Sequence, residues 1–416
     1  MNPLHLAILL LAPLFAASDE LDAVIVLYRH GDRTPVDPYP TDPYRNTSYW
    51  PVGFGQLTNI GKQQHFELGK WLRNRYGDFL PDKYSEEDIY VRSTDVDRTL
   101  MSAYSNLAGL YEPRGGQIWN ANIDWQPIPV HTKPEKEDPV LAMKKHCPRY
   151  NQLMSQLFLS KEFQNIANKY KELYEYLTQM TGKTVNDIAQ TEYIFNTLFI
   201  EELYNYTLPE WTNKVYPTGM QELAQLSFAV PCYTRELTRL KTGLLINEFI
   251  EHMHEAISEN ADNEKKRKKV WMYSAHDTTV ANVLSALRLF EHHCPPYAST
   301  VILELKHNEN GLRYVNVLYK NSTEARQMRL PECEENCPLN NFVALLRDVT
   351  ITPDEWEEDC ELDRIDPATM SMMKQMIVIG STSIALLLTF CILIYILCGT
   401  TKKSQQTYFR LPDSEI

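Results

Sequence analysis

The stretch VIVLYRHGDRTPVDPYP, residues 24–40, places two arginines around a histidine where an apolar run ends. Arg29, His30 and Arg33 follow directly after the run Val24–Tyr28. Guanidinium groups are planar, permanently charged and bidentate toward phosphate oxygens. A neutral imidazole is a nucleophile, and neighbouring guanidiniums lower its pKa and keep it neutral in acid. The stretch therefore indicates a phosphate site, although an ion-paired surface loop would contain the same residue types.

Two further apolar runs end in residues with related chemistry. Ile89–Val91 is followed by Arg98 at the start of a helical segment, and Val270–Ala275 is followed by His276 and Asp277. Ligands of open α/β sheets bind outside the carboxyl ends of the strands, so we expect the residues of the three runs to meet. Asp277 would act as a general acid and protonate a departing alkoxide. Phosphate binding by the arginines, attack by the imidazole and this protonation require neither a metal nor another cofactor.

The elements that must hold these residues form an α/β core with a helical insertion. The three apolar runs are of the kind that is buried on both faces of a parallel sheet. Between about residues 145 and 262 the pattern is helical, with little strand signal. We predict an α/β sandwich built from residues 19–144 and 263–360, with an all-helical cap region at 145–262 between them.

The composition limits the class of partner. The chain has 416 residues, 44% of them hydrophobic, which is enough to bury a large core. Its net charge of −13 argues against nucleic acid as a partner, because phosphate backbones bind basic surfaces. The basic run Lys265–Lys269 is interpreted as a solvated loop, since the export signals below exclude a nuclear signal.

Two segments indicate export and membrane anchoring. The apolar run Leu4–Ala17 ends in small residues, and residues 1–18 are predicted to be a cleaved signal peptide. Residues 376–398 are uncharged and long enough to span a bilayer, and two lysines follow at 402 and 403. A buried core helix is the alternative for this segment. We predict a single-pass type I membrane protein with its catalytic part in the lumen or outside the cell.

The remaining segments would be a stalk at 361–375 and a cytoplasmic tail at 399–416. The tail contains Tyr408 followed by Leu411, a spacing that sorting adaptors read as an extended peptide. This motif favours an endosomal or lysosomal route. The cell surface, or release of the lumenal domain by proteolysis, is the alternative destination.

The cysteines agree with an exported protein. Six of the eight lie outside the predicted span: Cys147, Cys232, Cys294, Cys333, Cys337 and Cys360. Sequence alone does not choose among their pairings, but disulfides are favoured over a zinc site because no second close cysteine or histidine pair has ligand spacing. No other metal site is predicted. Three glycosylation acceptors fit the same compartment: Asn46, Asn205 and Asn321.

Residues 29–35, RHGDRTP, match the Arg-His-Gly-x-Arg-x-Pro signature of the histidine acid phosphatases, and His276–Asp277 matches the distant His-Asp pair of that family. The resemblance covers nearly the whole predicted lumenal chain, through GFGQLTNIGKQQHFELG, RSTDVDRTLMSA, WQPIPVHT, MYSAHDTTV and PPYAS. It is greatest for the prostatic and lysosomal types, and the predicted span and tail favour the lysosomal type.

The resemblance implies a phosphoglycerate-mutase-like α/β fold with a helical cap, and a homodimer. It implies that His30 is the nucleophile that becomes phosphohistidine and that Asp277 is the proton donor. The residues that it implies for phosphate binding are Arg29, Arg33, Arg98 and His276.

The resemblance also implies two disulfides, Cys147–Cys360 and Cys333–Cys337. The third pair of the family falls on Ile200 and Thr300 here, where there is no cysteine. We therefore expect Cys232 and Cys294, which are left over, to form a substitute bridge.

The predicted function is hydrolysis of phosphate monoesters to an alcohol and orthophosphate at acid pH. A narrower phosphatase for inositol phosphates or lysophospholipids is one alternative, and a mutase is disfavoured because the resemblance extends through both halves of the chain. A non-catalytic receptor for phosphate-bearing cargo is another alternative. A receptor would retain the arginines and lose His30 and Asp277, and both are present.

Overall fold

The computed structural model describes residues 19–258, 268–362 and 386–396. The chain divides into a unit that ends at Cys360 and a second unit that begins at Glu361. Of the second unit, residues 361–362 and 386–396 are described, and residues 386–396 are helical. In the part of the chain that is described, no helix is both long enough and apolar enough to cross a bilayer.

Several predicted segments lie outside the described residues. They are the signal peptide at 1–18, nearly all of the stalk at 361–375, the ends of the span at 376–398, and the tail at 399–416 with Tyr408 and Leu411.

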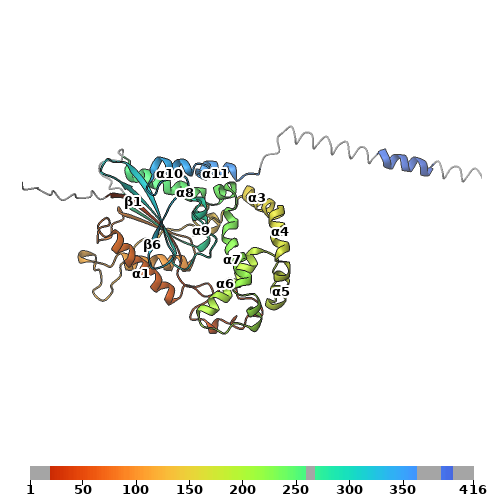
Figure 1. Cartoon of the computed structure of the whole chain (residues 1–416), viewed down its shortest axis with the longest axis horizontal. Coiled ribbons are helices and arrows are strands. Elements are labelled where there is room, and N and C mark those ends of the chain that lie inside the picture. Colours follow the sequence, from red (N-terminus) through yellow and green to blue (C-terminus); the bar gives the residue numbers. More distant parts are fainter. Residues whose placement is uncertain (1–18, 259–267, 363–385, 397–416) are drawn as a thin grey trace, which may run out of the picture. The chain divides into compact units, whose positions relative to one another are not determined.

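A single mixed sheet forms the centre of the first unit (Figure 1). Its strand order is β2-β3-β1-β4-β5-β6, and β7 pairs with β5. The strands β1, β2 and β3 are parallel, and β4 to β7 pair in antiparallel fashion. Their bounds are β1 Glu20–Arg29, β2 Ile89–Ser93, β3 Val270–Ala275, β4 Thr300–His307, β5 Arg313–Lys320, β6 Ala325–Met328 and β7 Cys337–Pro338. The prediction that the three apolar runs are strands of one parallel group is confirmed.

The register of the parallel strands aligns the ends from which the candidate residues emerge. Arg29, the last residue of β1, pairs with Ala275, the last residue of β3. Ser93, the last residue of β2, pairs with Ser274 of β3. Because β4 runs antiparallel to β1, its first residue, Thr300, lies at the same edge. Four chain segments therefore meet where the parallel strands finish.

Side chains alternate between the two faces of the sheet, and each face packs against different helices (Figure 1). Val24, Val26 and Tyr28 belong to one buried cluster, together with residues of α1 and α2. Ile25 and Leu27 belong to the opposite cluster, together with residues of α8, α9 and α10. Burial on both faces explains why these strands are continuous apolar runs.

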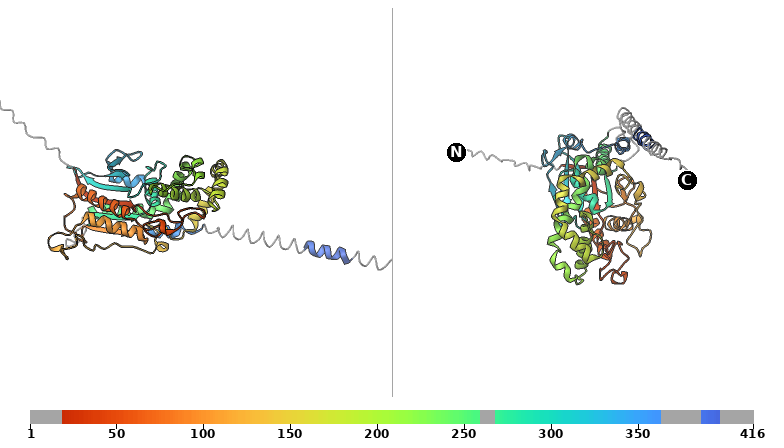
Figure 2. Two further views of the ribbon diagram at one scale, coloured as in Figure 1. Left: turned by 90° about the horizontal axis from the view of Figure 1, so that it is seen from below. Right: turned by 90° about the vertical axis from the view of Figure 1, so that its right-hand side faces the viewer.

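The helices are numbered along the chain (Figures 1 and 2). Helices α1 and α2 cover one face of the sheet, and helices α3 to α7 gather at its end. Their bounds are α1 Asn59–Tyr76, α2 Asp97–Leu110, α3 Pro148–Leu159, α4 Lys161–Lys169, α5 Lys171–Thr181, α6 Ile188–Leu203, α7 Thr218–Ala229, α8 Arg235–Ile257, α9 Asp277–Ala286, α10 Leu339–Leu345 and α11 Pro353–Asp359.

The predicted cap region, 145–262, is helical in its described residues. Residues from α4 to α7 build a hydrophobic cluster of their own, centred on Leu177, Leu198 and Leu223. The last helix of the region, α8, instead packs in the cluster of the sheet through residues such as Phe249.

Helix α6 begins where the side chain of Asp187 accepts a hydrogen bond from the backbone of Gln190. Towards its end, Glu201 is fully buried, and Asp42 from the loop after β1 is buried beside it. Burial, together with repulsion from Asp42, raises the pKa of Glu201 to about 9. Burial also raises the pKa of Asp42. At acid pH, this carboxyl pair is therefore accommodated without two buried negative charges.

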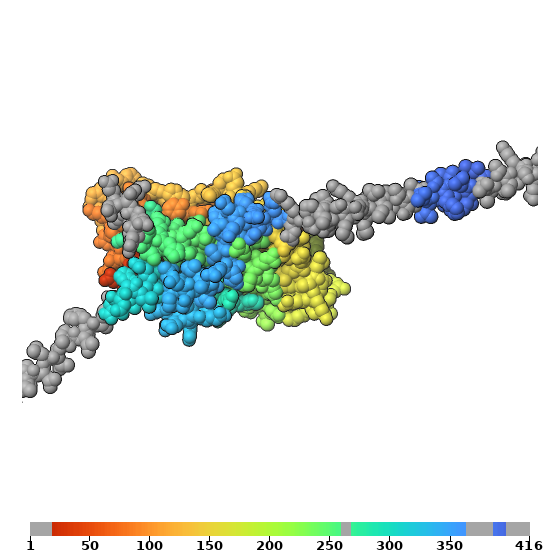
Figure 3. Space-filling model, turned by 90° about the horizontal axis from the view of Figure 1, so that it is seen from above, coloured from red at the N-terminus to blue at the C-terminus, as the bar shows by residue number. Residues whose placement is uncertain are grey.

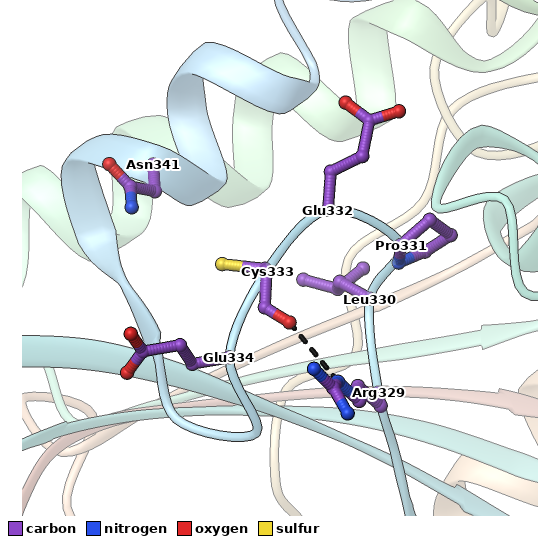
Figure 4. Close-up of a pocket in the computed structure, with 7 residues that line it drawn as sticks. All are labelled: Arg329, Leu330, Pro331, Glu332, Cys333, Glu334 and Asn341. Carbon is purple, nitrogen blue, oxygen red and sulfur yellow. Dashed lines mark hydrogen bonds between the residues drawn. The ribbon is translucent and has the colours of Figure 1, made fainter.

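Two of the three predicted disulfides are present, Cys147–Cys360 and Cys333–Cys337, with Cα–Cα distances of 4.8 and 5.5 Å. The first ties the start of α3 to the end of α11, beside Trp356 and α8. Figure 3 shows the face of the molecule where α8 and the C-terminal helices α10 and α11 lie side by side. The second closes a short loop, in which Arg329 Nε donates a hydrogen bond to the carbonyl of Cys333 at 3.2 Å (Figure 4).

The predicted bridge between Cys232 and Cys294 is wrong, because both cysteines are free. Cys232 is buried in the 3₁₀ turn Val230–Cys232 that precedes α8, near Lys241 and Arg235. Cys294 lies in the loop after α9 and is close to Arg29. Burial raises the pKa of each thiol to about 12, so both are protonated. Leftover cysteines do not imply a bond when the fold gives them different surroundings.

Replacing Glu201 with glutamine is expected to protect the protein against alkaline pH. A carboxyl whose pKa is raised by folding contributes stability below its unfolded-state value, here 4.5, and loses it as the pH rises through about 9. We therefore expect Glu201→Gln to melt at least roughly 3 °C above the wild type at pH about 9, with a smaller difference at pH about 5.

Thermal unfolding followed by circular dichroism at both pH values measures this difference. Glu172→Gln removes an exposed carboxyl of α5 and is the matched control, for which we expect no such change. Parallel melting curves of wild type and Glu201→Gln across the whole pH range would contradict the assignment.

Candidate active site

The guanidinium of Arg29, at the end of β1, is held by groups from the segment after β3 and from the segment before β4. Its Nη2 lies 2.9 Å from Oδ2 of Asp277, and its Nη1 donates a hydrogen bond to the carbonyl of Pro295 at 2.5 Å. The guanidinium lies over the ring of Tyr297, 4.2 Å from its centroid. Its backbone carbonyl is bonded by His65 Nε2 of α1. The side chain is 5% exposed, so this geometry is set by protein contacts.

His30 follows Arg29 and is almost completely buried. Its Nδ1 lies 2.8 Å from the carbonyl of Gly31. A carbonyl only accepts, so Nδ1 carries the proton and the neutral ring has its lone pair at Nε2. Burial, followed by the charges of Arg29, Arg98 and Arg33, lowers the pKa of His30 well below its ordinary value of 6.5. The imidazole is therefore uncharged in moderately acidic solution.

Gly31 allows helix α1 to approach the loop that contains His30. A Cβ on Gly31 would lie 2.4 Å from the carbonyl oxygen of Gly61, which is closer than real Cβ contacts. The amide of Gly31 donates to Ser102 Oγ of α2 at 3.1 Å. The glycine in the signature is thus required by packing against two helices.

Arg33 and Arg98 bring two more positive charges to the same place. Arg33 Nη1 donates to the carbonyl of Thr34, and its Nη2 donates to Oδ1 of Asn196 on α6, both at 3.1 Å. Burial, followed by repulsion from Arg33, lowers the pKa of Arg98 to about 10. The Nε atoms of Arg29, Arg33 and Arg98 are buried and donate no hydrogen bond within the described residues. Three guanidiniums with unused donors favour an oxyanion.

His276 and Asp277 complete the group from the third strand. Arg98 Nη2 lies 3.5 Å from His276 Nδ1, and the other ring nitrogen lies 3.1 Å from Oγ1 of Thr94. Burial, followed by the charge of Arg98, lowers the pKa of His276 to about 3, so this ring is neutral as well.

Asp277 is the first residue of α9 and bonds the backbone N–H of Thr278 at 2.8 Å. Burial opposes the ionisation of this carboxyl. The charges of Arg29 and Arg33 outweigh burial and lower the pKa of Asp277.

The structure thus brings together the six residues predicted for the site: Arg29, His30, Arg33, Arg98, His276 and Asp277. It adds contacts that the sequence reasoning missed, from Thr94, Asn196 and Tyr297. Tyr297 lies in the segment PPYAS, which carried part of the resemblance. Nothing in the local pattern around Asn196 indicates that this face of a cap helix reaches the site.

Asp32 connects the same loop to both helical layers. Its Oδ2 accepts hydrogen bonds from Thr58, which caps α1, and from the hydroxyl of Tyr204, which follows α6, the latter at 2.8 Å. Asp32 therefore orients the loop between His30 and Arg33 and is fully buried. No cluster of three or more potential metal ligands occurs in residues 19–258, 268–362 or 386–396.

Comparison with known proteins indicates a single family. Residues 20–320 match the model of the histidine phosphatase superfamily, branch 2. The chain is 41% identical over 351 residues to prostatic acid phosphatase of Bos taurus, covering 82% of this chain and 88% of that protein. It is 38% identical over 412 residues to lysosomal acid phosphatase of Xenopus laevis, covering 96% and 92% respectively.

Solved structures show the same fold at much lower identity. A phytase of Hafnia alvei in complex with tartrate superposes with a TM-score of 0.61 at 16% identity, covering 83% of this chain and 99% of that chain. At this identity the likeness concerns the fold alone.

Inorganic phosphate is expected to stabilise the protein through the three guanidiniums. Binding to the folded state alone stabilises it by about 2.7 kcal/mol at a concentration a hundred times the dissociation constant. Replacing Arg98 with alanine removes a charge-assisted contact worth about 1.5–3 kcal/mol, so the rise in melting temperature with phosphate should fall by more than about half.

Differential scanning fluorimetry with increasing phosphate at constant ionic strength measures the effect. The control is Arg114→Ala, which removes an exposed arginine paired with Asp82 and should retain the wild-type response. Equal responses of the three proteins would show that phosphate does not bind between these arginines.

Proposed function

The chain belongs to the histidine phosphatase superfamily, branch 2, and we propose that it is an acid phosphatase whose nucleophile is His30. The observation that carries this proposal is the state of His30. It is a buried imidazole with Nδ1 held by a carbonyl, surrounded by three guanidiniums that keep it uncharged. The relatives named prostatic and lysosomal acid phosphatases support the same reaction, hydrolysis of phosphate monoesters.

In the first half of the proposed reaction, Arg29, Arg33 and Arg98, with His276 beside Arg98, bind the oxygens of the phosphoryl group. His30 Nε2 attacks phosphorus, so that a P–N bond forms while the bond to the ester oxygen breaks. The proton of Asp277 passes to the departing oxygen, which leaves as the alcohol.

In the second half, water attacks the phosphohistidine. The carboxylate of Asp277 takes a proton from this water, and the P–N bond breaks to release orthophosphate. His30 is restored as a neutral imidazole and Asp277 as a carboxylic acid. The protein's own residues supply each group in this sequence.

The charges in the site account for activity at acid pH. The lowered pKa of His30 means that the nucleophile stays neutral as the pH falls below 6.5. Arg29 and Arg33 lower the pKa of Asp277, and a bound phosphate offsets their charge. Substrate binding therefore raises the pKa of Asp277 towards the protonated form that the first step needs.

We further propose that the protein is anchored in a membrane, with the phosphatase in the lumen of lysosomes or endosomes, and that it forms a homodimer. The apolar segments at 1–18 and 376–398 and the tail motif with Tyr408 and Leu411 support this location, as do relatives named lysosomal acid phosphatases. Sorting adaptors would be partners of the tail. Glycosylation remains a prediction for three exposed acceptors, Asn46, Asn205 and Asn321.

Replacing His30 with alanine is expected to lower turnover by at least about a thousandfold, as loss of a catalytic nucleophile does. Rapid acid-free quenching with a radiolabelled phosphate ester should trap an acid-labile phosphoenzyme in the wild type and none in His30→Ala. His146→Ala removes an exposed histidine and should retain the phosphoenzyme. A phosphoenzyme that persists in His30→Ala would disprove the assignment of the nucleophile.

Replacing Asp277 with asparagine should slow esters in proportion to how much their leaving group needs a proton. For glycerol 2-phosphate, an alkyl ester, we expect the first turnover to slow by at least about a hundredfold. For 4-nitrophenyl phosphate, whose leaving group departs as a stable anion, the first turnover should slow far less.

Quenched-flow measurement of the first turnover separates this step from hydrolysis of the phosphoenzyme. Asp97→Asn is the matched control, because Asp97 is likewise the first residue of a helix, α2, and is exposed. Equal slowing of both esters in Asp277→Asn would argue that Asp277 is not the proton donor.

A further inference from the structure

Helix α6 presents a second polar residue towards the site besides Asn196. Glu192 lies one helical turn before Asn196, so both project from the same face of the helix. Asn196 accepts a hydrogen bond from Arg33 at 3.1 Å, which places this face against the arginines. The carboxyl of Glu192 interacts electrostatically with Asp277, Arg33 and Arg29. A cap helix therefore places a carboxyl beside the catalytic group.

Glu192 has no structural partner that would explain it. Within the described residues, its carboxyl forms no hydrogen bond and no ion pair shorter than 4.0 Å. The residue is half-buried. Glu202, on the same helix, differs in this respect, since it accepts a hydrogen bond from Tyr216. An unpaired carboxyl that faces the site is available to the substrate.

The electrostatics indicate which part of the substrate Glu192 meets. Among the charged groups that act on it, Asp277 has the largest effect, followed by Arg33 and Arg29. Glu192 forms no ion pair with Arg29 or Arg33, which bind the transferred phosphoryl group, and its strongest charged neighbour is Asp277, the proposed donor to the leaving group. These observations favour a place on the side of the alcohol. We propose that Glu192 selects the leaving group, favouring esters whose alcohol carries an amine and disfavouring esters with further phosphates. This inference rests on the proposed function.

Coulomb's law gives the direction of this selectivity. The guanidiniums are occupied by the transferred phosphoryl group and Asp277 carries the proton for the leaving group, so a second phosphate on the alcohol would meet the carboxylate of Glu192. An ammonium group on the alcohol would be attracted by this carboxylate, and the interaction is strong in a partly buried site. Amino-alcohol phosphates are therefore the substrate class that this arrangement suits.

The selectivity depends on pH through the charge of Glu192. Burial and repulsion from Asp277 raise the pKa of Glu192 to about 7, while Arg33 and Arg29 act in the opposite direction. The thiol of Cys294, in the loop after α9, is close to Glu192 and stays protonated because burial raises its pKa to about 12. The carboxyl is thus neutral at pH about 5 and becomes charged as the pH rises through about 7.

The test compares kcat/KM for three esters at pH about 5 and about 8. They are O-phosphoethanolamine, glycerol 2-phosphate and fructose 1,6-bisphosphate, whose alcohols are cationic, neutral and anionic. At pH about 8 we expect Glu192→Gln to lower the preference for phosphoethanolamine over the bisphosphate by about tenfold relative to wild type. At pH about 5 the two proteins should agree within about twofold. For each protein, kcat/KM for the other two esters is expressed relative to kcat/KM for glycerol 2-phosphate.

Glu192→Ala provides a second variant, and Glu172→Gln, an exposed carboxyl on α5, is the control that should keep the wild-type preference. A preference at pH about 8 that stays within about twofold of wild type in both Glu192 variants overturns the inference and leaves the proposed function intact. If the wild type hydrolyses none of the three esters and does not hydrolyse 4-nitrophenyl phosphate either, the proposed function is overturned instead.

Discussion

The mutual repulsion of three guanidiniums, two buried and one half-buried, is the constraint around which this protein is built. Arg29 and Arg33 come from the end of β1 and the loop after it, Arg98 comes from the start of α2, and Arg33 lies close enough to lower the pKa of Arg98. Burying like charges is unfavourable unless each is paired or hydrogen-bonded. The carboxylate of Asp277 and the carbonyl of Pro295 serve Arg29, and Asn196 serves Arg33. In the proposed reaction, the remaining donors bind the oxyanion of the substrate.

The scaffold meets this constraint through the register of its parallel strands and through one cap helix. The register brings the ends of β1, β2 and β3 to one edge, so that no long loop is needed to assemble the charges. Helix α6 then closes the edge. Asn196 bonds Arg33, the adjoining Tyr204 bonds Asp32, and Glu201 is buried against Asp42. The same helix that stabilises the loop also presents Glu192 to the substrate.

The pKa shifts of several of these groups suit activity at acid pH. His30 and His276 stay neutral in acid because burial and arginine charges lower the pKa of each. Glu201 and Glu192 are protonated in acid because burial and a neighbouring carboxyl raise the pKa of each. Low pH therefore relieves repulsion between carboxyls in the cap without charging the nucleophile.

The sequence by itself determined the three parallel strands and the six central site residues, because these depend on local apolar runs and on motifs at their ends. The two disulfides were implied by the resemblance to the histidine acid phosphatases, since the sequence positions of the cysteines do not choose among their pairings. The predicted bond between Cys232 and Cys294 was wrong, because the number of cysteines left over says nothing about the distance between them. Asn196 and Glu192 were not predicted from the sequence. Their roles depend on how α6 is rotated and where it packs, and helical periodicity predicts an apolar face without indicating which distant loop the polar face meets. Only the tertiary structure decided this, because the contacts join residues more than 160 positions apart, as between Arg33 and Asn196, |i−j| = 163.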